Sequence, residues 1–254
     1  MDVTTYFRNI AAWVNRSKKE SAFVFIHGYN TTFEDAARRT TQITYDIRFK
    51  GAPVFYSWLS NGDPGDYISD EEDMRWSTTN LEKFLADFAQ ESQADQFFLI
   101  AHSMGARALT SAYVSLIHNY SALKEKFIEI ILSAPDIVSD IFKRDIAPAI
   151  FAGTGKLTLY ASSKDKALQL SSEMHGGYPR AGESGANLIV LEGMESIDLT
   201  SVRTDFLNHS YAVENRSVLS DIYHIVHNSL RAHERFGLEP VSTSLALNYW
   251  RFKR

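Results

Sequence analysis

Short apolar runs alternate with longer amphipathic stretches along this chain, and the alternation limits the possible folds more than any other feature of the sequence. Runs rich in β-branched and aromatic residues occupy 22–26, 53–58, 96–101, 127–132, 157–161 and 187–191. Between the first two, Ala36, Thr40, Ile43 and Ile47 recur at helical spacing. Strands that alternate with helices form a parallel sheet covered by helices. The sequence therefore predicts an α/β class fold, with a doubly wound, mainly parallel sheet of about six or more strands and helices on both faces.

The same periodicity places the remaining elements. Helices are predicted at 33–49, 78–90, 105–119, 137–142, 166–174 and 213–233, and surface loops at 60–73 and 175–185. Residues 240–254 are predicted to form a terminal packing segment. In such a sheet, ligands bind outside the carboxyl ends of the strands, so functional residues are expected directly after strands.

Composition limits the function. With 254 residues and 44% apolar residues, the chain can bury one large core, and we predict a single domain over residues 1–254. Cysteine is absent, which excludes disulfides and thiolate metal sites, and no cofactor or metal is expected. A net charge of −5 with scattered basic residues argues against nucleic acid as a partner.

No apolar stretch is long enough for a membrane span. The sequence predicts a soluble protein, cytoplasmic as given, or periplasmic or secreted if a leader was removed.

A serine follows the third apolar run, in Ala101-His102-Ser103-Met104-Gly105, and a helical pattern begins at once. A serine on a sharp turn between a strand and a helix projects its hydroxyl above the sheet edge, as a nucleophile requires. Small residues two positions before and after it allow neighbouring backbones to approach. Ser103 is therefore the candidate nucleophile. The alternative is that Ser103 only caps the helix, because serine is favoured at that position.

The first apolar run ends in His27-Gly28-Tyr29-Asn30. In enzymes with this serine turn, a loop at that place donates one backbone N–H to the oxyanion, and the residue after the serine donates the other. Tyr29 and Met104 are the predicted oxyanion donors. His27 is expected to support the loop through a side-chain hydrogen bond.

The base and the acid should follow the serine in the order acid, then histidine. Only His209 lies in a loop after the predicted last strand, so we predict that His209 is the general base. Two acids follow strands, Asp165 after the fifth and Asp136 after the fourth. Asp165 is the first choice because such folds usually supply the acid from the penultimate strand. Asp136 stays as the alternative, and its other interpretations are a helix cap or a residue of the pocket wall.

The aromatic residues Tyr29, Trp58 and Tyr67 fall near strand ends and are the predicted substrate-binding residues, although Trp58 could instead belong to the core. No long lid insertion follows the fourth strand, which favours an open cleft for short- to medium-chain acyl esters. The predicted partner is a small-molecule ester, cleaved through a Ser-His-Asp triad and an acyl-enzyme. The alternatives are a thioesterase, an amidase, a phospholipid acyl hydrolase, or an inactive hydrolase fold that serves as a binding module. The sequence does not define an oligomeric state.

These motifs resemble a bacterial family of the lipase and esterase superfamily, domain of unknown function 900. The resemblance covers roughly residues 22–232 and rests on the segments 25–30, 57–58, 101–105, 133–136 and 209–211, with Tyr67 and the acids at 70–72. It implies the α/β-hydrolase fold, the positions of the triad and an activity toward carboxylic esters.

Overall fold

In the computed structural model, which describes residues 2–153, 155–202 and 215–253, eight strands form one sheet in the order β2-β1-β3-β4-β5-β6-β8-β7. Every neighbouring pair is parallel except the terminal hairpin of β7 and β8. The strands are β1 (Ser21–Ile26), β2 (Ala52–Tyr56), β3 (Gln96–His102), β4 (Phe127–Ser133), β5 (Lys156–Ala161), β6 (Met194–Asp198), β7 (Leu238–Ser242) and β8 (Asn248–Phe252). The predicted doubly wound α/β class is confirmed.

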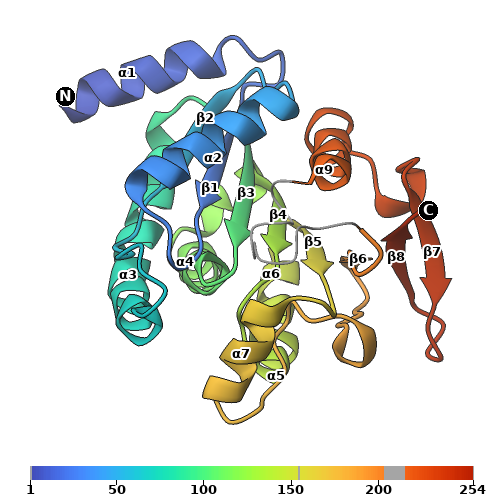
Figure 1. Cartoon of the computed structure of the whole chain (residues 1–254). Helices are drawn as coiled ribbons and strands as arrows, with labels where there is room; N and C mark the ends of the chain where they lie inside the picture. Colours follow the sequence, from blue (N-terminus) through green and yellow to red (C-terminus); the bar gives the residue numbers. More distant parts are fainter. Residues whose placement is uncertain (1, 154, 203–214, 254) are drawn as a thin grey trace.

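Helices cover both faces of this sheet (Figure 1). The longer ones are α1 (Val3–Val14), α2 (Phe33–Asp46), α3 (Tyr67–Glu91), α4 (Gly105–Asn119), α7 (Lys166–Met174) and α9 (Arg216–Asn228). Between β4 and β5 the chain forms three short segments, α5 (Ser139–Ile141), the π-helical η2 (Phe142–Ile146) and α6 (Ala147–Phe151). Short 3-10 helices occupy η1 (Ser121–Lys126), η3 (Gly185–Asn187) and η4 (Ala232–Glu234). None of the described helices is long and apolar enough to cross a membrane.

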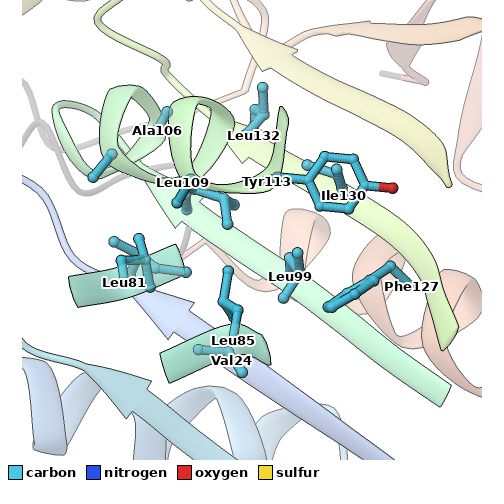
Figure 2. Close-up of a cluster of buried hydrophobic side chains, with 14 of the residues drawn as sticks. Val24, Leu81, Leu85, Leu99, Ala106, Leu109, Tyr113, Phe127, Ile130 and Leu132 are labelled. Carbon is cyan, nitrogen blue, oxygen red and sulfur yellow. The ribbon is translucent and has the colours of Figure 1, made fainter. Parts of the chain in front are cut away.

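The central strands are buried on both faces, so alternate residues enter two separate cores. In β1, every residue is buried, with Val24 packed toward one core and Phe23 and Phe25 toward the other. The first core contains residues of α3 and α4, and Figure 2 shows Leu81 and Leu109 of these helices meeting the strand residues. The second core contains residues of α2 and α9. Each fully buried aliphatic side chain contributes about 1.5–3 kcal/mol, so the two cores hold the strand ends rigidly in place.

The prediction of a strand at 187–191 is wrong, because the sixth strand is β6 at Met194–Asp198. Residues 188–191 are irregular although all four of them are apolar. β6 contains Glu195 and Ser196, both buried, and Glu195 is neutralised by Arg231 and Arg235. A buried ion pair thus gives this strand a polar sequence, which the apolar pattern did not reveal.

Other boundaries also differ from the predictions. Helix α3 begins at Tyr67, eleven residues before the predicted start at Thr78, because the buried acids Asp70 and Glu71 make its first turns look like a surface loop. The predicted helix at 137–142 continues through η2 and α6. Helix α1 was not predicted at all, and the segment 240–254 contributes the hairpin of β7 and β8. Helix α7, by contrast, has the predicted bounds.

Candidate active site

Ser103 lies on the turn between β3 and α4, with a backbone φ of +52°. This left-handed conformation costs a residue other than glycine about 1–2 kcal/mol, and strain of this kind concentrates at functional sites. The turn is held at both ends, since the N–H of Ser103 donates to the carbonyl of Ser133 at 3.0 Å and its carbonyl accepts the N–H of Asp136 at 3.2 Å. The surrounding strands therefore fix the strained turn.

Two glycines let the loop after β1 touch this turn. A Cβ atom on Gly105 would lie 2.2 Å from the carbonyl oxygen of His27, and one on Gly28 would lie 2.9 Å from the Cβ of Ser103. Neither position has room for a side chain. Gly28 and the following Tyr29 thus lie directly beside Ser103, as expected of an oxyanion loop.

The predicted oxyanion donors differ in their surroundings. Met104 is fully buried and precedes the first residue of α4, so the N-terminal end of this helix adjoins Ser103. Unpaired N–H groups at a helix N-terminus favour a negative charge nearby. Tyr29 is partly exposed; its hydroxyl donates to the carbonyl of Pro64 at 2.6 Å, and its ring meets the ring of Tyr67 edge-on.

His27 supports the loop through a side-chain hydrogen bond, as the sequence predicts. Its Nδ1 lies 2.8 Å from the carbonyl oxygen of Gly28, and burial lowers the pKa of the imidazole, which favours a neutral ring that donates this bond. Trp58 stacks on the His27 ring and donates its indole N–H to the carbonyl of His27 at 2.8 Å. At 2% exposure, Trp58 does not line the pocket beside Ser103. Trp58 belongs to the first core, the alternative that the sequence left open, and its contact with substrate stays a prediction.

A pocket of about 150 Å³ opens beside Ser103. It brings together three other residues that the sequence predicts for the site, Tyr29, Tyr67 and Asp136. The rest of its wall is mostly apolar and comes largely from α7, a helix that no sequence motif connects with the site. These residues are Pro64, Gly65, Ile68, Ala167, Leu168, Leu170, Ser171 and Met174. Helix α7 follows Asp165 directly, so its place after a strand was the one available signal.

Asp136 forms the polar end of this pocket. Its Oδ2 accepts a bond from the Tyr67 hydroxyl at 2.5 Å, and its Oδ1 accepts one from the Ser171 hydroxyl at 2.7 Å. Two cations flank it, Arg107 at 3.1 Å and Arg180 at 3.4 Å. Burial alone would raise the pKa of Asp136, but Arg107 and the two hydroxyls lower it. Asp136 is therefore an ionised carboxylate with both of its oxygens already occupied.

Arg107 connects this carboxylate to α3. Its guanidinium contacts Glu71 at 2.6 Å and the Tyr67 hydroxyl at 3.0 Å, and its Nε donates to the backbone carbonyl of Asp136. Glu71 also lies 3.1 Å from His175 at the end of α7. Sequence spacing could not reveal this cluster, because Glu71 and Asp136 lie 36 and 29 residues from Arg107.

Asp165 follows β5 and is buried, at 3% exposure. Its Oδ1 caps α7, accepting the N–H groups of Ala167 and Leu168, both at 3.1 Å. The predicted base, His209, lies outside the described residues, so its contacts with Ser103 and Asp165 stay predictions. In the described part of the chain, no histidine lines the pocket and no group of three or more acidic or histidine side chains could hold a metal ion.

A mostly parallel sheet with a tight strand–turn–helix at the carboxyl end of a central strand, together with the family match, defines the class as α/β hydrolase. The chain belongs to the family described as alpha/beta hydrolase of unknown function (DUF900), whose model matches residues 4–227. This confirms the resemblance that the motifs indicate.

Several solved structures are similar to this chain at low sequence identity. A predicted CIB-like hydrolase from Thermoplasma acidophilum is 14% identical, with a TM-score of 0.46 over 84% of this chain and 88% of that chain. An esterase from Pyrococcus furiosus is 11% identical, with a TM-score of 0.46 over 83% and 84%. Lipase B from Aspergillus fumigatus is 10% identical, with a TM-score of 0.47 over 84% and 55%. No curated protein matches the sequence.

Proposed function

We propose that this protein is a serine hydrolase that cleaves carboxylic esters with short- to medium-chain acyl groups. The observation that carries the proposal is the strained Ser103 turn, which opens onto a mostly apolar pocket beside the Tyr29 loop and the N-terminal end of α4. A plain helix cap would not need a left-handed serine, because capping residues have extended backbone torsions.

In the proposed mechanism, His209 removes the proton of Ser103 while Oγ attacks the acyl carbonyl carbon. The carbonyl oxygen becomes an oxyanion, and the N–H groups of Tyr29 and Met104 stabilise it, each by about 3–4 kcal/mol. His209 then returns the proton to the leaving alcohol. Water then attacks the acyl-enzyme carbonyl while His209 takes its proton, and the collapse of this intermediate releases the carboxylic acid as His209 returns the proton to the Oγ of Ser103.

Asp165 is the proposed acid of the triad. Asp136 is less suited to hold an imidazole, because its oxygens already accept two hydroxyl groups and lie beside Arg107 and Arg180. The place of Asp165 after β5, two strands along the sheet from β3, also fits the usual position of the acid.

The volume of the pocket supports a short acyl group. An apolar cavity of about 150 Å³ in another protein holds benzene, so this pocket has room for a group of about that size. The aliphatic side chains of Leu168, Leu170 and Met174 would contact the acyl chain, with Tyr67 at its polar end. Ester, thioester, amide and phospholipid bonds share the acyl carbonyl, so the pocket alone does not select the leaving group.

An active-site fluorophosphonate probe tests the proposal. The folded wild-type protein should be labelled, and mass mapping should place the adduct on Ser103. The variants Ser103→Ala and His209→Ala should lose labelling, and Asp165→Asn should lose turnover by about 10⁴-fold. The matched variant Asp136→Asn should retain more activity than Asp165→Asn.

Matched butyrate esters, thioesters and amides then identify the bond that is cleaved, and the ester should be the best substrate. A phospholipid assay completes the set. An unlabelled but folded wild-type protein would contradict the proposal and favour a binding module.

A further inference from the structure

Asp70 is an acidic residue that the proposed mechanism does not use, although it is completely buried in the first turn of α3. It does not line the pocket beside Ser103. Within the described parts of the chain, no basic side chain forms an ion pair with it. A buried carboxylate is costly unless hydrogen bonds compensate it, so its partners indicate why it is there.

The partners of Asp70 come from two loops at the carboxyl edge of the sheet. Its Oδ2 accepts the hydroxyl of Ser60 at 2.7 Å and the N–H of Asn30 at 3.3 Å, and its Oδ1 accepts the N–H of Asn61 at 2.9 Å. Ser60 in turn accepts the N–H of Thr31 at 3.1 Å. Asp70 thus ties the loop after β1 to the loop after β2.

The bond to Asn30 lies next to the proposed oxyanion donor. Asn30 follows Tyr29 directly and has a left-handed φ of +54°, a conformation in which asparagine is enriched among residues other than glycine. On the other side of Tyr29, His27 lies 2.8 Å from the carbonyl oxygen of Gly28.

The peptide geometry connects these two contacts. The carbonyl of Gly28 and the N–H of Tyr29 belong to one planar trans peptide and point in opposite directions. His27 therefore fixes the direction of the Tyr29 N–H from one side, and Asp70 fixes the next peptide from the other. Losing either contact would let this short segment rotate.

We infer that Asp70 is a positioning residue for the oxyanion hole: through Asn30, and through Ser60 to Thr31, it holds the loop after β1 so that the Tyr29 N–H points at the oxyanion. This inference rests on the proposed function. An oxyanion donor acts mainly in the transition state, so a misaimed donor should lower kcat and leave KM nearly unchanged.

The test compares Asp70→Asn with Glu72→Gln, which removes a negative charge from the same helix at an exposed position. An asparagine keeps the shape of the aspartate but presents an NH₂ group to one of the present donors. For Asp70→Asn, we expect kcat for a butyrate ester to fall about 10²-fold, the loss typical of one oxyanion donor, with KM within about twofold. Glu72→Gln should match the wild type in both constants.

A trifluoromethyl ketone inhibitor provides a second readout. It binds serine hydrolases as a hemiketal oxyanion, so its inhibition constant should rise in Asp70→Asn in proportion to the loss of kcat/KM. A merely structural role would lower the melting temperature without this parallel change. Unchanged kcat and inhibitor affinity in a folded Asp70→Asn variant would overturn the inference.

Ser60→Ala offers a milder variant if Asp70→Asn folds poorly. It removes the hydroxyl that joins Asp70 to Thr31, so kcat should fall by a smaller factor, again with KM unchanged. In the double variant the two losses should not multiply, because both act through one network; multiplicative losses would contradict the inference. A wild-type protein without labelling at Ser103 would refute the proposed function itself. An active wild type, with kcat and inhibitor affinity unchanged in the Asp70 variants, would refute only the role of Asp70.

Discussion

Glu129 should make the stability of this protein fall as the pH rises. The residue lies on β4 at 4% exposure, and its carboxyl group accepts one bond, from the Thr158 hydroxyl at 2.7 Å. Nearby, Arg235 contacts Glu195 at 2.5 Å and Asp221 at 2.9 Å, and Arg231 contacts Glu195 at 2.8 Å. The two arginines are thus already matched by two other acids.

Burial, with a smaller contribution from the neighbouring Glu195, raises the pKa of Glu129 from 4.5 to about 7. A raised pKa means that the folded state holds the proton more tightly than the unfolded chain does. The stabilising effect of that proton is complete below pH 4.5 and is lost as the pH rises through about 7. The full loss is about 3 kcal/mol, of which roughly 2 kcal/mol falls between pH 5.5 and 8.5.

The perturbation is Glu129→Gln, which keeps the shape and an acceptor for Thr158 but removes the titrating group. Urea unfolding at pH 5.5, 7.0 and 8.5 and constant ionic strength gives the free energy of unfolding for the variant and the wild type. The wild type should lose roughly 2 kcal/mol more than the variant over this range. Glu125→Gln, at an exposed position, should follow the wild type. Parallel pH curves for wild type and Glu129→Gln would refute the reasoning.

Three further predictions follow from the site. Ser103→Gly should be about 1 kcal/mol more stable than Ser103→Ala in urea unfolding, because only glycine relieves the left-handed strain and both variants lack the hydroxyl. Gly105→Ala should lower the free energy of unfolding by about 1–3 kcal/mol and abolish ester turnover, because its methyl group would meet the carbonyl oxygen of His27. Leu168→Ala should cost about 2–5 kcal/mol in thermal or urea unfolding and shift the best acyl chain in a series of p-nitrophenyl esters to a longer one.

The sequence predicts the central part of this fold well, for a physical reason. Strands β1, β3, β4 and β5 are buried on both faces, so their apolar runs stand out and their carboxyl ends can be located. The turn at Ser103 follows from one of these ends. Helix α7 begins where the sequence predicts because Asp165 caps its N-terminus. Pairings between distant segments, such as Arg107 with Glu71, leave no local pattern and could not be predicted.

The places where the pattern misleads share one property, which is the burial of polar side chains. Asp70 and Glu71 make the start of α3 resemble a surface loop in the sequence. Glu195 and Ser196 interrupt the apolar run that would otherwise mark β6. Hydrophobic periodicity assumes that polar residues face water, so it fails where a polar group is buried against specific partners. Burying such groups is costly, and natural proteins break local rules mainly at sites that function requires. Of the two misread segments, α3 adjoins the oxyanion loop and the pocket, which is why the buried acid of that helix is the residue that we tie to catalysis.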